Sequence, residues 1–384
     1  MLKKTIRRLG ALAMVLAMAV SVFAVSASAV GEEVATTYNK VTEFTKNVLT
    51  DGKTFKPDTT FTFTVTPFTA DGDTTVEGTA IHYYAGKAGD IRFTDVAFSP
   101  AGEGNTPSDK GYTANGNIEV KKNAYAKPGV YAYTVTEDDG AYDGINYDRA
   151  TRYVYVYVVN TSGTGNVEAG VDKDGNKLYV SSIVVTKKVT DKEIGETKEV
   201  KTKEFNNDYG QNNDGTHDVT IIKKLAGDMA EADKQFTFEV TITPANGNNE
   251  KYMVKIKTLT GSETVTDALE VTNGVAKGTY KLKGDEYVTI SGLSIGDTIV
   301  VTEKEADQDG YTTTYTYDGV EAGYKEADKN TNKVTKDNAK ITVTNAKTAT
   351  SPTGVIMNIA PYAMMLVVAG AFAVVFLSRR NRAE

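Results

Sequence analysis

The chain has 384 residues, of which 40% are hydrophobic and 24% are charged, and its net charge is −7. It is therefore long enough for two domains and too acidic to bind nucleic acid through phosphate contacts. No cysteine or tryptophan and only two histidines, His82 and His217, are present, which leaves little material for disulfides, a zinc site or a hydrolase triad. We expect a protein that is not an enzyme and uses no metal or cofactor, with both histidines on the surface.

The first 29 residues have the order of a secretory signal peptide. Basic residues at positions 3, 4, 7 and 8 precede an apolar run from Leu9 to Val25, and the small residues Ala27, Ser28 and Ala29 follow. This order predicts cleavage after Ala29. We expect the chain beyond it to be exported, where the absence of cysteine requires a source of stability other than disulfides.

The middle of the chain predicts β-strands almost throughout. Segments such as Phe61–Val65 and Tyr131–Val135 alternate with period two and are rich in Thr, Val, Tyr and Phe, as strands are. Asp-Gly pairs at 71–72, 139–140 and 174–175 separate these segments, and no long helical period occurs between the termini. Many short strands between turns predict an all-β fold of antiparallel β-sandwiches.

The segment Asp172–Asn176 has a superficial likeness to a calcium-binding loop. Its glycine comes two positions too early, and the last position of the loop is Ile183 instead of a glutamate, so the required ligands are missing. We expect a hairpin turn at Asp174–Gly175 and no metal site.

The chain repeats itself loosely, which predicts two domains. The segment Phe61–Pro67 returns as Phe236–Pro244, and Tyr133–Glu137 returns as Ile299–Glu303. The polar stretch Asn206–Gly215 lies between the copies and is expected to be a linker. We place the first domain at residues 33–209 and the second at residues 216–347.

Six polar residues recur in the same order in the two copies. Each follows an apolar residue by two positions, and residues two apart on a strand face the same side of the sheet. They are Lys46, Glu137 and Asn207 in the first copy and Lys223, Glu303 and Asn345 in the second. We expect all six on the apolar, inward faces of their strands, with Tyr131 and Tyr133 on the same face as Glu137.

A buried lysine and a buried glutamate are costly unless they are neutralised. Burial lowers the pKa of an amine and raises the pKa of a carboxyl, so both groups tend toward their uncharged forms. A neutral amine attacks a carboxamide that a protonated carboxyl activates, which predicts a Lys–Asn isopeptide bond in each copy, with Glu137 and Glu303 as catalysts. Taken singly, each residue has a plainer interpretation: a lysine that extends to water, an asparagine in a turn and a solvated glutamate.

The repeated order of Lys, Glu and Asn resembles the two-domain backbone pilins of Gram-positive bacteria, which have pilin isopeptide-linkage domains. The likeness covers essentially the whole mature chain. It rests on Thr45–Asn47, Val135–Glu137, Phe205–Asn207, Ile222–Leu225, Val301–Glu303 and Thr344–Asn345. The resemblance implies two tandem Ig-like (CnaB-like) antiparallel β-sandwich domains, with Lys46 joined to Asn207 and Lys223 joined to Asn345.

The C-terminal segment, residues 351–384, resembles the sorting signal that a sortase recognises in that family. Pro352, Thr353 and Gly354 precede an apolar span at 359–377, which is long enough for a transmembrane helix, and basic residues follow. The resemblance implies cleavage between Thr353 and Gly354 and transfer of Thr353 to an amine. The motif lacks the leucine and the intervening residue of the commonest form, which points to a dedicated pilus sortase.

In that family the acceptor lysine of the neighbouring subunit lies shortly before the last strand of the first domain. The corresponding region is residues 198–205, in which Lys201 is nearest to the expected place. Lys198 instead has the outward strand position of an exposed nucleophile. Either lysine is alternatively a solvated edge residue that discourages strand aggregation.

The resemblance implies a structural subunit of a covalent pilus at the cell wall and cell surface, made as a membrane-anchored precursor. Its partners would be a pilus-specific sortase, neighbouring copies of itself, tip and basal pilins, and peptidoglycan. The alternative is an adhesin or stalk protein with the same domains that is anchored singly to the wall. No residue pattern indicates a host ligand.

Overall fold

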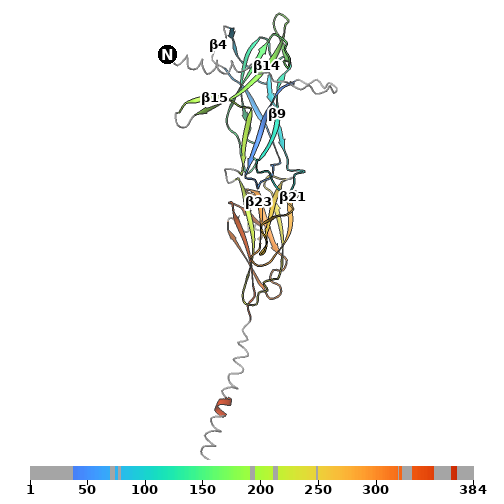
Figure 1. Ribbon diagram of the computed structural model, residues 1–384, viewed down its shortest axis with the longest axis vertical. Coiled ribbons are helices and arrows are strands. Elements are labelled where there is room, and N and C mark those ends of the chain that lie inside the picture. The colour runs from blue at the N-terminus through green and yellow to red at the C-terminus, as the bar shows by residue number, and fades with distance from the viewer. Residues whose placement is uncertain are drawn as a thin grey trace, which may run out of the picture.

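The computed structural model describes residues 38–69, 74–76, 79–190, 195–210, 215–247, 250–318, 320–321, 331–349 and 365–369. Two β-sandwich domains are stacked end to end, which makes this part of the molecule elongated (Figure 1). The expected signal peptide at 1–29 and the expected sorting motif around Thr353 lie outside the described residues. Within those ranges the only helix is at 365–369, and no helix is long and apolar enough to cross a membrane.

The first domain contains two main sheets. Its strands are β1 (Tyr38–Thr50), β2 (Thr59–Phe61), β3 (Phe63–Pro67), β4 (Thr74–Val76), β5 (Thr79–Ile81), β6 (Tyr83–Ala85), β7 (Ile91–Phe93), β8 (Val96–Phe98), β9 (Tyr112–Lys121), β10 (Gly129–Glu137), β11 (Ile145–Asn146), β12 (Arg152–Val159), β13 (Val167–Val171), β14 (Lys177–Thr190), β15 (Thr197–Lys201) and β16 (Glu204–Tyr209). One sheet has the order β11-β16-β1-β9-β7, and the other has the order β13-β14-β12-β10-β3, with β15 beside β14 and β6 beside β10. The hairpin of β14 and β15 projects from the side of the domain (Figure 1).

The second domain has two layers that form one continuous hydrogen-bonded path. Its strands are β17 (Thr216–Ala226), β18 (Phe236–Thr243), β19 (Lys251–Lys257), β20 (Thr264–Val265), β21 (Leu269–Thr272), β22 (Val275–Leu282), β23 (Tyr287–Ser294), β24 (Thr298–Glu303), β25 (Thr312–Asp318), β26 (Val320–Glu321), β27 (Thr331–Val334) and β28 (Ala339–Ala346). The order β25-β28-β17-β23-β19 continues through β21 into β22-β18-β24-β27-β26. Strand β21 therefore connects the layers at one edge.

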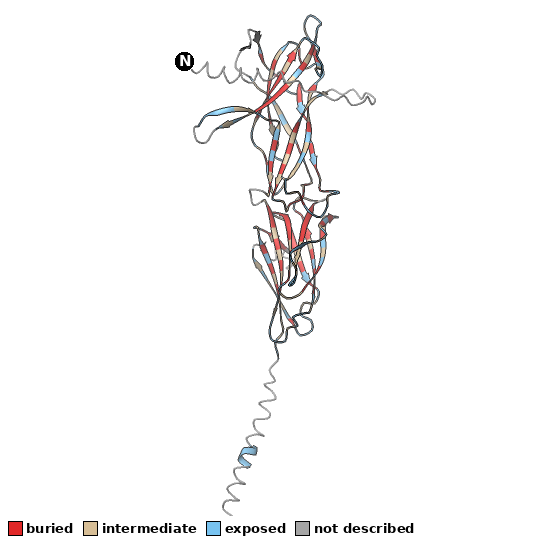
Figure 2. Cartoon of the chain, viewed as in Figure 1, coloured by how far each residue is buried: buried red, intermediate tan, exposed pale blue. Residues whose placement is uncertain are grey.

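The cores follow from the two-residue period of the strands. Buried residues alternate with half-buried or exposed ones along strands such as β9 and β18 (Figure 2), because successive side chains point to opposite faces of a sheet. Each domain has its own apolar cluster between its two sheets, centred on residues such as Phe44 and Val135 in the first domain and Phe238 and Ile341 in the second. The all-β fold expected from the sequence is present.

The expectation of purely antiparallel sheets is wrong in both domains. In the first domain the short strand β6 pairs in parallel with β10. The first and last strands of that domain, β1 and β16, also pair in parallel, and so do β17 and β28, the first and last strands of the second domain. Tight hairpins impose antiparallel pairing only on strands that are close in sequence. The first and last strands are separated by a whole domain, so their direction is free of that constraint.

The polar stretch expected to be a linker is partly a strand. Its first residues, Asn206–Tyr209, belong to β16, and β17 begins at Thr216. Direct contacts join the domains: Lys53 pairs with Asp218 at 2.9 Å, and the Nζ of Lys251 donates to the backbone oxygen of Glu103 at 2.6 Å. The two domains therefore meet in a bonded junction.

The two histidines differ from each other. His82 is exposed, as expected, but His217 is only 2% exposed. The placement of His217 on the surface is thus corrected. The residue shares the inward positions of β17 with Val219 and Ile221, which are fully buried.

Candidate cross-linking sites

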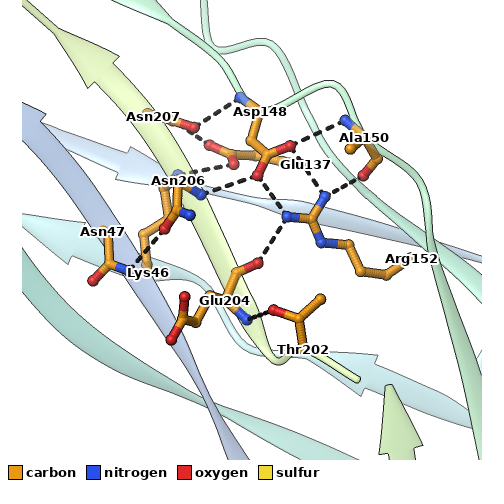
Figure 3. Close-up of polar contacts among 10 residues, drawn as sticks. All are labelled: Lys46, Asn47, Glu137, Asp148, Ala150, Arg152, Thr202, Glu204, Asn206 and Asn207. Atoms are coloured by element: carbon orange, nitrogen blue, oxygen red, sulfur yellow. Dashed lines mark hydrogen bonds and ion pairs between the residues drawn. The ribbon is translucent and has the colours of Figure 1, made fainter. Parts of the chain in front are cut away.

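In the first domain a buried carboxylate lies between a lysine and an asparagine. Nζ of Lys46, on β1, lies 2.9 Å from Oε2 of Glu137 at the end of β10. The carboxamide nitrogen of Asn207, on β16, donates to Oε1 of the same carboxylate at 2.6 Å. Lys46 and Asn207 are fully buried, and Glu137 is 7% exposed (Figure 3).

The second domain repeats this arrangement with residues from the corresponding strands. Nζ of Lys223, on β17, lies 2.9 Å from Oε2 of Glu303 at the end of β24. Nδ2 of Asn345, on β28, donates to Oε1 of Glu303 at 2.5 Å. The structure therefore brings all six residues selected from the sequence together, as two sets of three.

The parallel strand pairing sets this geometry. In the register of β1 and β16, Lys46 lies opposite Phe205 and Val48 lies opposite Asn207, so lysine and asparagine are two positions apart on the same inner face. The second domain has the same offset, with Lys223 opposite Val343 and Leu225 opposite Asn345. Each glutamate comes from the facing sheet and reaches across the core between the two partners.

Burial drives the charged groups of these sites toward neutrality. It lowers the pKa of Lys46 to about 8, even though Glu137 opposes the shift. Burial likewise raises the pKa of Glu137 above its ordinary value against the influence of Lys46, and it lowers the pKa of Lys223. A low-polarity pocket disfavours the charged form of these three groups, which makes proton exchange between Lys46 and Glu137 easier.

Aromatic rings cover both lysines. Nζ of Lys46 lies 4.6 Å from the ring centre of Phe61, and Nζ of Lys223 lies 4.2 Å from that of Phe236. This role was not predicted from the sequence, although both phenylalanines begin the repeated Phe-Thr-Phe segment. Tyr133 is buried like Glu137, but its hydroxyl donates to Asp90 at 3.0 Å.

Two further residues join the first site and were also missed. The backbone N–H of Asp148 donates to the carboxamide oxygen of Asn207 at 2.8 Å, and the guanidinium of Arg152 binds the Asp148 carboxylate (Figure 3). Arg152 shares the inward positions of β12 with Val154 and Val156. The parity rule that selected Lys46 would have found this arginine.

The candidate acceptor lysines lie on the projecting hairpin. Lys198 and Lys201 are both exposed on β15. Residues 202 and 203 lie between β15 and β16 and belong to neither strand. The inward–outward alternation of β16 therefore does not extend back to Lys198 and Lys201, and it does not distinguish the two lysines. Lys203 is half-buried, and its Nζ donates to the hydroxyl of Thr42 at 2.7 Å. Pro352, Thr353 and Gly354 lie outside the described residues.

Comparison with known proteins finds a matching family for each of the two domains. Residues 42–210 match the family described as the Spy0128-like isopeptide containing domain. The first domain is therefore similar to Spy0128-like isopeptide domains over nearly all of its length. Residues 217–347 match a domain family of unknown function, DUF7601. The second domain nevertheless places a lysine, a glutamate and an asparagine as the first domain does.

The whole chain is similar to streptococcal pilins. It is 28% identical over 347 residues to a pilin of Streptococcus pyogenes serotype M1, a match that covers 88% of this chain and 90% of that protein. The crystal structure of the major pilin from Streptococcus pyogenes is 23% identical, with a TM-score of 0.55, and the match covers 80% of this chain and 98% of that one. The major pilin protein T3.2 from serotype GAS13637 is 21% identical, with a TM-score of 0.52 and coverage of 81% and 99%. The chain thus has the β-sandwich fold of these pilins and is similar to a streptococcal pilin over most of its length.

Proposed function

We propose that this protein is a structural subunit of a sortase-assembled covalent pilus on the Gram-positive cell surface. In this proposal isopeptide bonds Lys46–Asn207 and Lys223–Asn345 stabilise the subunit. One observation carries the proposal: in each domain a single buried carboxylate contacts both the lysine amine and the asparagine carboxamide. Similarity to pilins supports the same assignment.

The geometry supports a complete reaction path in the first domain. Neutral Nζ of Lys46 attacks Cγ of Asn207, the new N–C bond forms, and the carbonyl electron pair moves to Oδ1. Glu137 accepts a proton from the attacking nitrogen and gives one to Nδ2, after which the old C–N bond breaks and ammonia leaves. Because Oε2 faces the attacking nitrogen and Oε1 the departing one, this transfer needs no movement of the carboxylate.

The reaction occurs once per site and has no external substrate. Holding amine and carboxamide together in a folded core replaces a bimolecular encounter by a unimolecular step. The product amide is neutral, so the buried lysine charge disappears. We therefore assign no enzymatic turnover to this chain.

The bonds would give the subunit its mechanical role. Each connects the first strand of a domain to the last, where the chain enters and leaves the sandwich. A covalent bond between these strands carries load that backbone hydrogen bonds would otherwise bear. In the absence of cysteine, it provides the stabilisation that disulfides provide in other exported domains.

Subunit assembly would use the C-terminal sorting motif of one copy and a lysine on the first domain of the next. A pilus-specific sortase would cleave between Thr353 and Gly354, hold Thr353 as an acyl-enzyme and pass it to a lysine of the next copy. Lys201 or Lys198 on the exposed β15 hairpin would be the acceptor. Transfer of the last subunit to peptidoglycan would anchor the fibre at the cell wall.

The mass of the intact protein tests the cross-links. We expect the unaltered chain to be lighter than its formula by two ammonia molecules, and Lys46→Met or Lys223→Met to be lighter by one. A mass equal to the unmodified formula would refute the bonds.

Polymerisation is tested separately in cells that express the pilus sortase. We expect the unaltered chain to give a ladder of detergent-resistant species of high mass. Thr353→Ala should abolish the ladder, and so should the substitution of whichever lysine is the acceptor, Lys201→Arg or Lys198→Arg. Lys173→Arg is the matched control, because Lys173 is exposed (85% of its side chain) on another hairpin of the same domain. A single wall-linked band from the unaltered chain would favour the adhesin alternative.

A further inference from the structure

We propose that the backbone N–H of Asp148 is a catalytic hydrogen-bond donor for the Lys46–Asn207 reaction, and that Arg152 is the residue that positions it. The inference rests on the proposed cross-linking function and adds a second partner to Glu137. It concerns the first domain alone, so the second domain serves as an internal reference.

The donor contacts the atom at which charge develops. When Nζ of Lys46 adds to Cγ of Asn207, the carbonyl electron pair moves to Oδ1, which becomes an oxyanion. The N–H of Asp148 lies 2.8 Å from this oxygen, within the distance at which a fixed donor stabilises an oxyanion. At the other end of the carboxamide, Nδ2 donates to Glu137, so the group to be attacked is held from both sides.

The carboxylate of Asp148 ties its own backbone to the strand that carries Asn207. Arg152 binds it with both arms of its guanidinium, Nη1 to Oδ1 at 3.0 Å and Nη2 to Oδ2 at 2.5 Å. The backbone N–H of Asn206 donates to Oδ2 at 3.0 Å. Nη2 of Arg152 also donates to the backbone oxygen of Glu204 at 2.7 Å, so contacts reach β16 on both sides of Phe205.

The clamp that Arg152 and Asp148 form is largely buried. The Arg152 side chain is 1% exposed, and its guanidinium lies 4.4 Å from the ring centre of Phe205. Although burial alone raises the pKa of Asp148, hydrogen bonds from Arg152 and from the N–H of Asn206 hold the pKa below its ordinary value. The carboxylate therefore stays charged, and a two-armed ion pair with arginine fixes orientation as well as distance.

The second domain provides the contrast. Among the residues that the structure describes, Oδ1 of Asn345 is buried and has no hydrogen-bond partner. Its lysine and glutamate nevertheless have the same arrangement as those of the first domain. A change at Asp148 or Arg152 should therefore slow the Lys46–Asn207 reaction only. The Lys223–Asn345 reaction in the same molecule then reports how well the chain has refolded.

The rates of the two reactions test the donor. Unlinked full chain, recovered in denaturant from inclusion bodies, is diluted into folding buffer with mild detergent, and bond formation at each site is followed by proteolysis and mass spectrometry. Replacing the N–H of Asp148 by an ester oxygen removes the donor and leaves every side chain in place. We expect it to slow the Lys46–Asn207 reaction roughly 100- to 1,000-fold and to leave the Lys223–Asn345 reaction unchanged.

Two matched substitutions test the clamp. Arg152→Lys keeps the charge and loses the two-armed contact, and we expect it to slow the first-domain reaction. Arg149→Lys makes the same change three residues earlier in the chain, at a side chain that is 76% exposed and pairs with Asp139, and we expect it to have no effect. Equal first-domain rates for the two variants would overturn the positioning role.

The pH dependence separates catalysis from loosening of the pocket. Loss of a donor lowers the first-domain rate by the same factor at every pH. An opened pocket would instead hydrate Lys46, raise its pKa toward the ordinary value and move the pH at which the rate declines. That shift, or an unchanged rate in the ester-containing chain, would overturn the inference. Absence of ammonia loss from both domains of the unaltered chain would refute the proposed function itself, and this inference with it.

Discussion

Lys46 and Asn207 contact opposite oxygens of one buried carboxylate from neighbouring parallel strands. The nitrogen that must lose a proton and the nitrogen that must gain one therefore face the same Glu137. The second domain repeats this relationship with Lys223, Glu303 and Asn345.

Each glutamate should control its own bond. We expect Glu137→Ala to lose only the first-domain cross-link and Glu303→Ala only the second, so each variant should be lighter than its formula by one ammonia. Each variant should also unfold at a lower urea concentration. We expect its free energy of unfolding to be lower by about 3–5 kcal/mol or more, because removal of one partner leaves a buried lysine uncompensated. Glu239→Ala is the control, since Glu239 forms an exposed ion pair with Lys304. Loss of both bonds in either single variant would contradict independent sites.

The two bonds should differ under tension. Force that enters at Lys201 reaches β17 through β16 and bypasses most of the first domain, but it must cross the whole second domain to leave at Ala346. We expect Glu303→Ala to lower the unfolding force more than Glu137→Ala when single molecules are pulled between these points. Equal forces for the two variants would refute this load path.

The rate of the first-domain reaction should level off and then fall in alkali. The reactive form has a neutral Lys46 amine beside a protonated Glu137 carboxyl. It differs from the ion pair only in the position of one shared proton, so the fraction of molecules in the reactive form does not change with pH until that proton is lost. Because the pKa of Lys46 is lowered to about 8, we expect the rate to decline above that pH, where the carboxyl has no proton to give. Phe61→Ser should admit water and move the decline upward. A rate that keeps rising through the ordinary lysine pKa of 10.5 would contradict proton donation by Glu137.

The junction between the domains should be sensitive to pH. The hydroxyl of Tyr252 lies between Glu250 and Asp297, at 2.8 and 3.1 Å, and Tyr142 of the first domain donates to Glu250 at 2.9 Å. Burial, with the nearby charge of Glu250, raises the pKa of Asp297 from 3.8 to about 7. Between these values the folded state holds a proton that the unfolded state has lost, so the free energy of unfolding falls as pH rises through that window and then levels off.

Denaturant unfolding across this pH range, compared with Asp297→Asn, provides the measurement. We expect the difference in stability between the unaltered chain and the variant to shift in favour of the variant as pH rises to about 7. A difference that stays constant with pH would show that Asp297 has no raised pKa.

Much of the site was accessible from the sequence because strand periodicity is a local property. Two-residue alternation placed Lys46, Glu137 and Asn207 on apolar faces, and the structure buries all three. The same rule would have found Arg152, which begins the alternating strand β12. It did not find Phe61, because a phenylalanine on an inward face looks the same whether it covers a lysine or another apolar side chain.

Amino-acid order alone determined the all-β fold and the inward positions of the six polar residues. Only the tertiary structure decided that β1 and β16 run in parallel, that the glutamate approaches from the facing sheet, and that Asp148 presents its N–H to Asn207. Alternation depends on neighbours along the chain, whereas strand pairing depends on closure of the whole sandwich. Every residue except proline has a backbone N–H, so its direction is set by the folded path of the chain and not by the side chain it belongs to.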